Sequence, residues 1–117
     1  MDRFKKIKKY SPLTETMFYI LISLLKPLHG YGIMQKVEKL SRGRIKLGPG
    51  TLYGALGNLL EAKLIELRDR DQDPGDRRKV YSITDFGIEL VTFEVDRLQE
   101  MLVDSKILLK ERGKYNG

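Results

Sequence analysis

The last third of the chain carries an apolar repeat that requires one long helix. From residue 84 to about residue 110 there is no proline, and apolar side chains recur in alternating steps of four and three, as in a heptad seam. At 1.5 Å per residue, about 25 helical residues make a rod of roughly 38 Å. The core of a domain of this size cannot cover such a rod, so part of it should meet another chain. The seam positions are Val91, Val95, Leu98, Leu102, Ser105 and Leu109.

The apolar stretch at residues 13–25 predicts an earlier helix with apolar side chains on two faces. A helix of this kind is usually covered on both sides. We therefore expect a homodimer in which the last helix packs partly on this earlier helix of the partner. The expected interface consists of Phe18, Ile22, Leu25, Val91, Val95, Leu98, Leu102 and Leu109.

The order of the predicted elements is helix, helix, helix, strand, strand, helix. Ser11 and Pro12 are expected to open the first helix, the second runs from about residue 30 to residue 41, and the third follows a turn at residues 48–51. Alternating patterns at 65–67 and 80–83 predict a β-hairpin with a charged tip. The expected fold is mainly α with a small β-hairpin, a winged helix-turn-helix followed by a long C-terminal dimerisation helix.

The third helix has an unusual outward face. Its leucines cluster on one side, whereas Gly54, Gly57 and Asn58 lie on the other. Glycine inside a helix costs about 1 kcal/mol relative to alanine, so the missing side chains need a reason. A bare face allows close approach, either by a neighbouring helix or by another molecule such as DNA.

Charge is unevenly distributed. The chain has 22 Lys and Arg against 16 Asp and Glu, a net charge of +6. Residues 1–79 hold 17 basic and nine acidic residues, whereas residues 80–117 hold five basic and seven acidic. This asymmetry indicates a polyanionic partner, and we expect double-stranded DNA, for the first two thirds of the chain.

Composition argues against an enzyme. The absence of cysteine excludes disulfides and thiolate metal sites, and a single histidine leaves little for a histidine metal site or a catalytic triad. We expect no metal and no cofactor. The longest apolar run has nine residues, too few for the roughly 20 that span a bilayer. We therefore expect a cytoplasmic protein without a membrane segment.

Two segments identify a family. HGYGIMQKVEKLSRGRIKLGPGTLYGALGNLLEAKLIE, followed by DRRKVYSITDFGIELV, closely resembles the PadR family of bacterial transcriptional regulators over about residues 13–100. The resemblance implies a homodimeric repressor that binds an inverted-repeat operator. By matching positions, Pro49, Gly50, Thr51 and Tyr53 would lie at the DNA-facing start of the recognition helix, and Arg77 and Arg78 at the wing tip. With the charged and bare-face residues added, the expected DNA-binding set is Lys46, Pro49, Gly50, Thr51, Tyr53, Gly54, Asn58, Arg77, Arg78 and Lys79.

Some members of the family bind aromatic or drug-like effectors between subunits. The corresponding expectation here is a hydrophobic small molecule, and simple core packing is the other interpretation of the same side chains. The candidate lining consists of Met17, Phe18, Phe93 and Met101.

One alternative function remains open, a winged-helix adaptor for protein partners that has lost DNA binding. The retained basic residues favour DNA, although four aspartates between residues 69 and 76 partly neutralise the wing. The expected organisation is a basic N-terminal arm at 1–10, a DNA-binding domain at 11–83, a dimerisation helix at 84–112 and a disordered tail at 113–117. The arm is interpreted as a DNA arm, a short amphipathic helix or a frayed terminus.

Overall fold

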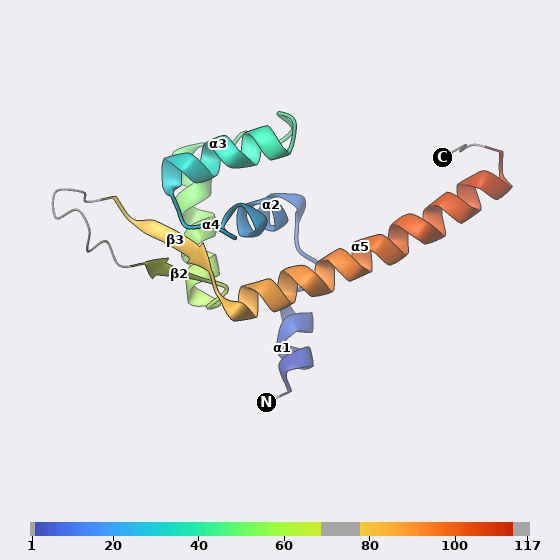
Figure 1. Ribbon diagram of the computed structural model, residues 1–117, viewed down its shortest axis with the longest axis horizontal. Helices are drawn as coiled ribbons and strands as arrows, with labels where there is room; N and C mark the ends of the chain where they lie inside the picture. Colours follow the sequence, from blue (N-terminus) through green and yellow to red (C-terminus); the bar gives the residue numbers. More distant parts are fainter. Residues whose placement is uncertain (1, 69–77, 114–117) are drawn as a thin grey trace.

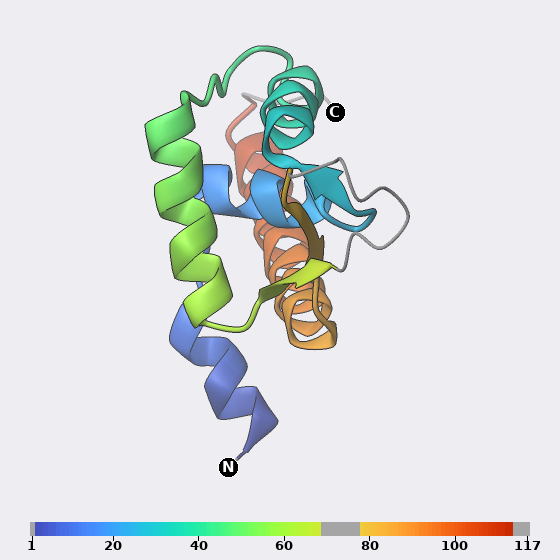
Figure 2. The same cartoon turned by 90° about the vertical axis from the view of Figure 1, so that its left-hand side faces the viewer.

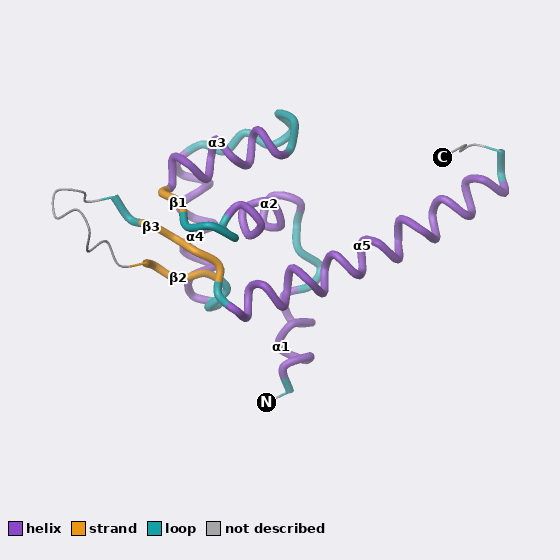
Figure 3. Tube along the Cα trace, in the orientation of Figure 1, coloured by secondary structure: helices purple, strands orange, loops and turns teal. Residues whose placement is uncertain are grey.

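The computed structural model describes residues 2–68 and 78–113. Figure 1 shows a small helical body with a hairpin on one side and a long helix leaving on the other. Figure 3 separates its helices from its strands. The elements are α1 (Arg3–Tyr10), α2 (Glu15–Ser23), β1 (Leu28–His29), α3 (Gly30–Leu40), α4 (Pro49–Glu61), β2 (Ile65–Arg68), β3 (Val80–Ile83) and α5 (Asp85–Glu111).

The three strands form one antiparallel sheet in the order β1-β3-β2. In the hairpin, Ile65 lies opposite Ile83 and Arg68 lies opposite Val80. The core forms where α2, α3, α4 and the start of α5 meet, with fully buried side chains such as Leu21, Ile33 and Leu90. The predicted fold class, a winged helix-turn-helix with a long C-terminal helix, is confirmed.

The structure differs from the sequence-based expectation at two places, and at residues 1–10 it adds to an expectation that was left open. Helix α2 begins at Glu15 rather than at residues 11–12, because the Thr14 hydroxyl accepts a hydrogen bond from the Met17 N–H at 3.2 Å and caps the helix there. Strand β1 was not predicted, since two residues are too short to carry an alternating pattern. Residues 3–10 form α1, which packs against α5 through the Phe4 and Phe93 rings, 5.8 Å apart.

Only the first part of α5 belongs to the protomer's own core. Its buried residues are Gly87, Leu90, Val91 and Glu94, and the helix then extends beyond the helical body (Figure 1). Large apolar side chains on this extension, including Leu98, Leu102 and Leu109, are exposed in the single chain. The expectation that the domain core cannot cover the whole rod is therefore correct for one protomer.

The start of α5 is joined to the end of α4. Thr84 caps α5 by accepting from the Gly87 N–H at 3.0 Å, and its hydroxyl donates to the Lys63 carbonyl at 2.7 Å. Gly87 lies against the Leu64 carbonyl so closely that a Cβ there would collide with backbone. The recognition-helix candidate and the long helix are thus fixed to each other at this junction.

A buried carboxylate ties the segment before α2 to α5. Glu94 is 1% exposed and accepts hydrogen bonds from Ser11 Oγ at 2.6 Å, the Leu13 N–H at 2.5 Å and Arg97 Nε at 2.8 Å. Burial by itself raises the pKa of Glu94, but the hydrogen bonds from Arg97, Leu13 and Ser11 outweigh it and lower the pKa below the ordinary 4.5. The ionised form is therefore the stabilising one.

Glu94→Gln should lower the free energy of unfolding by about 2–3 kcal/mol at pH 7, because the amide cannot satisfy three donors as the carboxylate does. Since the folded-state pKa lies below the unfolded value, this contribution is fully present above pH 4.5 and is lost as the pH falls through the folded pKa. Urea unfolding at pH 7 and at acid pH, at one protein concentration, measures it. The exposed Glu100→Gln on the same helix is the control, and an equal difference between wild type and Glu94→Gln at both pH values would contradict the prediction.

Candidate nucleic-acid interface

Helix α4 separates its side chains into a packed face and a bare face. Leu52, Leu56 and Leu59 are buried in the core, whereas Gly54, Gly57 and Asn58 are exposed. A Cβ built at Gly54 or Gly57 meets no atom of the described residues within 4 Å. Packing of another helix of the described chain against this face is therefore excluded, and the face is open to a partner molecule.

The first turn of α4 is open to an anion. The helix begins at Pro49, and its capping residue Gly48 offers no side-chain hydrogen bond. The first turn contains no acidic residue. The first backbone N–H groups of a helix have no partner within the helix, and they carry the positive end of its dipole. Gly50 and Thr51, which lie on this turn, are exposed. This end of α4 is thus suited to a phosphate group.

Tyr53 lies where α4 meets the start of α3. A Cβ at Gly30 would lie 2.9 Å from Cζ of Tyr53 and closer still to its hydroxyl oxygen, so the ring packs directly on the bare Gly30 backbone. Tyr53 is nevertheless 51% exposed. The pKa of the Tyr81 hydroxyl on β3 is raised, mainly because the group is buried and to a smaller extent because Tyr53 is nearby. Tyr53 therefore has a ring fixed against Gly30, and about half of the residue is open to solvent or a ligand.

Sequence reasoning missed Tyr31, the neighbour of Gly30. It is 68% exposed at the first turn of α3, close to the position where Tyr53 packs. The sequence does contain a signal for an accessible tyrosine, because Tyr31 stands between Gly30 and Gly32. Glycines on both sides leave more space around its ring. Tyr31 is therefore an additional exposed tyrosine, next in sequence to the Gly30 backbone on which Tyr53 packs.

The loop between α3 and α4 is held to α2. Arg44 forms an ion pair with Glu15, and the Ile45 N–H donates to Ser41 Oγ at 3.0 Å. Lys46 follows these two anchors and is exposed. The predicted cation at 46 is therefore carried by a fixed loop just before the start of α4.

The hairpin supplies further exposed cations. Figure 2, which views the molecule from the hairpin side, shows α4 along one edge, with β2 leading away from its lower end and β3 farther across the view. Arg78 and Lys79 are exposed and immediately precede β3, and the pairing of Arg68 with Val80 brings Arg68 to the same end of the hairpin. The predicted wing residue Arg77 lies outside the described residues, as does most of the predicted tail at 113–117.

A family model described as the transcriptional regulator PadR-like family matches residues 19–92, which is more than half of the chain. The chain belongs to this family. The match begins within α2 and ends within α5, and it contains β1, α3, α4, β2 and β3 in full. This PadR-like chain is therefore a member of a family of transcriptional regulators.

Solved structures support the same fold. A PadR-like regulator from Bacillus cereus is 24% identical, with 90% of this chain and 96% of that chain covered and a TM-score of 0.66. RosR from H. salinarum is 25% identical over 81% of this chain and 79% of its own, with a TM-score of 0.60. Bacillus subtilis PadR in complex with operator DNA is 20% identical over 80% of this chain and 61% of its own, with a TM-score of 0.61.

A curated relative is less informative. An uncharacterized 37.1 kDa protein in a Streptomyces fradiae transposon is 36% identical over 75 residues, which are 64% of this chain. The aligned part spans about a fifth of that protein. It adds sequence similarity but no activity.

The residues predicted for a dimer occupy different environments in the protomer. Val91 is only 8% exposed and belongs to the protomer's own core, so it has little surface to offer a partner. Phe18 and Ile22 are half-buried, and Leu25 is exposed. The outward-facing members on α5 are Val95, Leu98, Leu102 and Leu109.

Of the residues predicted for an effector pocket, one lines a hollow described in the protomer. Phe93 lines a shallow hollow with Phe4 between α1 and α5. Met17, Phe18 and Met101 line neither that hollow nor the larger one beneath α1. Among the described residues, no helix is both long enough and apolar enough to cross a membrane.

Proposed function

We propose that this PadR-like protein is a sequence-specific DNA-binding repressor that binds an inverted-repeat operator as a homodimer. The observation that carries the proposal is the bare, exposed face of α4, together with the exposed cations on the loop before it and on the hairpin. Thr51, Tyr53, Gly54 and Asn58 would approach base edges in the major groove, which at about 12 Å admits a helix. Lys46, Arg77, Arg78 and Lys79 would hold phosphates.

The proposed dimer follows from α5. Its exposed apolar side chains have no cover within the described protomer, and a second copy with the same stripe would bury them symmetrically. Two copies of α4 would then face two half-sites, which is why we propose an inverted repeat. Bacillus subtilis PadR, which has the same fold and is in complex with operator DNA, supports DNA as the partner.

Release by a small apolar effector is a secondary proposal. We propose that Met17, Phe18, Phe93 and Met101 line a pocket where the two subunits meet. Met and Phe side chains adapt to varied ligand shapes. If the protein were instead an adaptor that does not bind DNA, the bare face of α4 would not contact a polyanion.

DNA binding should depend steeply on salt. A dimer that uses the four cations above from each subunit would neutralise about six to eight phosphates, which gives a slope of log K against log salt of roughly −5 to −7. Lys79→Ala should weaken operator and random DNA by similar factors and reduce the magnitude of the slope by about 1 per subunit. Fluorescence anisotropy across a salt series measures both quantities.

The matched control is Lys110→Ala, which removes the same charge near the far end of α5. It should leave the slope unchanged. A nearly flat slope for the wild type would support the adaptor function instead.

A further inference from the structure

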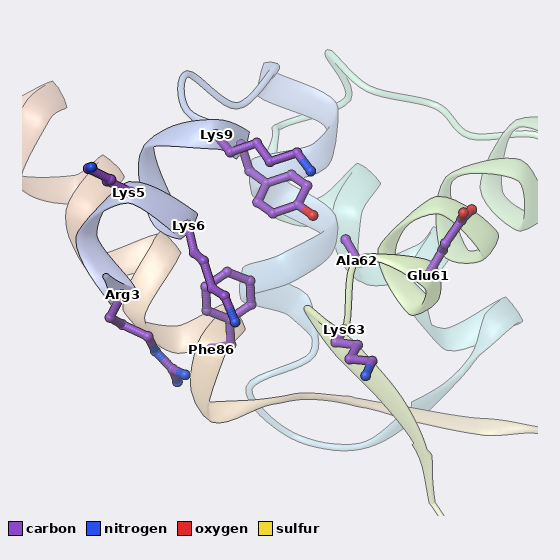
Figure 4. Close-up of a pocket in the computed structure, with 9 residues that line it drawn as sticks. Arg3, Lys5, Lys6, Lys9, Glu61, Ala62, Lys63 and Phe86 are labelled. Carbon is purple, nitrogen blue, oxygen red and sulfur yellow. The ribbon is translucent and has the colours of Figure 1, made fainter. Parts of the chain in front are cut away.

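A cationic hollow lies at the opposite end of α4 from its proposed DNA-binding start. It has a volume of about 460 Å³ and is bounded by α1, the turn that ends α4 and the first turn of α5 (Figure 4). Pro49 and Glu61 are twelve positions apart along α4, which corresponds to about 18 Å of helix. The hollow is therefore distinct from the first turn of α4.

Positive side chains enter the hollow from two sides. Lys6 and Lys9 extend from α1 toward the gap, while Lys63 lies across from them on the turn after α4 (Figure 4). Arg3 also lines the hollow, but it is partly neutralised by its ion pair with Glu89. Glu61 is the one acidic residue of the lining, and its carboxylate points away from the gap. At least three positive charges thus converge on a small volume.

Two aromatic rings form an apolar surface beneath these cations. Phe86 and Tyr10 lie edge to face with their centroids 6.1 Å apart, and both line the hollow. The Arg3 guanidinium lies 5.1 Å from the centroid of the Phe86 ring. The Lys9 ammonium lies 5.6 Å from the centroid of the Tyr10 ring, so each ring already contacts a cation. A planar anionic ligand would contact both the rings and these cations, whereas a DNA backbone would contact the cations alone.

The end of α4 does not need the lysines. Its last carbonyls accept backbone hydrogen bonds, from the Lys63 N–H to Leu60 at 3.0 Å and from the Leu64 N–H to Leu59 at 3.0 Å. The positive charge around the hollow therefore exceeds what the helix terminus requires. Like charges held close together repel, so an anion that bridges them would be favoured.

We propose that this hollow binds a small planar aromatic molecule that carries two or more phosphate or carboxylate charges. The ring would lie against Phe86 and Tyr10, and the anionic groups would bind Lys6, Lys9 and Lys63. The hollow adjoins the junction at which Thr84 links the end of α4 to α5, so a ligand there contacts both the DNA-binding unit and the long helix.

Calorimetric titration of the full chain without magnesium tests the proposal with four probes. ATP and benzene-1,3,5-tricarboxylate each combine a planar ring with several charges, tripolyphosphate supplies charge alone, and adenosine supplies the ring alone. At least one of the first two should bind more tightly than tripolyphosphate and adenosine, and the tighter one identifies phosphate or carboxylate as the preferred group. Failure of both to bind at millimolar concentration would overturn the proposal.

Substitutions in and near the hollow test where the ligand binds. The double variant Lys6→Gln/Lys9→Gln should weaken the tighter probe at least tenfold, whereas Lys8→Gln, on the same helix but outside the hollow, should change it less than twofold. Phe86→Leu should weaken the planar probe but not tripolyphosphate. Equal losses in the Lys8 variant and the double variant would show diffuse attraction to α1. A second contrary outcome is that operator DNA displaces the probe and the double variant reduces the slope of log K against log salt for DNA binding. These two results together would show that the hollow belongs to the DNA-binding surface. Either outcome would refute the proposal.

Discussion

Gly54→Leu should abolish operator recognition while making the folded protein more stable. In the protomer the new side chain meets no atom of the described residues within 4 Å of its Cβ, so it creates no clash in the fold. Replacing glycine inside a helix stabilises it by up to about 1 kcal/mol. In the complex, however, a leucine on the bare face would hold α4 away from the base edges.

Loss of close approach should affect specific binding more than non-specific binding. Base contacts require the helix to enter the groove, whereas the phosphate contacts of Lys46, Arg78 and Lys79 tolerate a small displacement. We expect operator affinity to fall at least 100-fold and affinity for random DNA to fall less than threefold. Gly54→Ala, which adds one methyl group, should give the same gain in stability with an intermediate loss of affinity.

The measurement pairs a melting temperature with operator and random-DNA titrations for wild type, Gly54→Ala and Gly54→Leu. A rise of a few degrees in melting temperature is the expected consequence of about 1 kcal/mol in a domain of this size. If both variants bind the operator as tightly as wild type, the bare face is not the DNA-binding face.

This prediction was accessible from the sequence because helical periodicity assigns faces directly. The leucines of α4 repeat at the spacing of a packed face, so the glycines had to lie opposite, and the structure places them there. What the sequence left open was whether another helix covers them. That depends on contacts between segments far apart in the chain, which local periodicity does not contain.

The anchoring of the segment before α2 shows the same limit more strongly. Glu94 lies between apolar positions of α5 and its local pattern indicates only a charged residue on a helix. Its partners Ser11 and Leu13 are 83 and 81 positions away, so burial of this carboxylate follows from tertiary packing alone. Strand β1 is a similar case, because Leu28 and His29 become a strand only by pairing with Tyr81 and Val80.

Leu98→Asp should separate the proposed homodimer into folded monomers. Leu98 is 43% exposed in the protomer and contributes no buried side chain to its core, so the substitution should change the stability of the monomer little. At a dry dimer seam, each subunit would instead bury an unpaired carboxylate, which costs several kcal/mol. We expect the dissociation constant of the dimer to rise by at least 100-fold.

Sedimentation at tens of micromolar distinguishes dimer from monomer. The wild type should have a mass of about 27 kDa, twice the 13.5 kDa of the chain. Leu98→Asp should have the monomer mass. Gln99→Asp adds the same charge at a neighbouring exposed position off the heptad seam and should remain dimeric. A wild type that is monomeric at this concentration would refute the proposed dimer. Leu98→Asp should also lose operator affinity while it keeps its helical content. This result would show that both half-sites must be held at once, because a single α4 supplies only half of the proposed contacts.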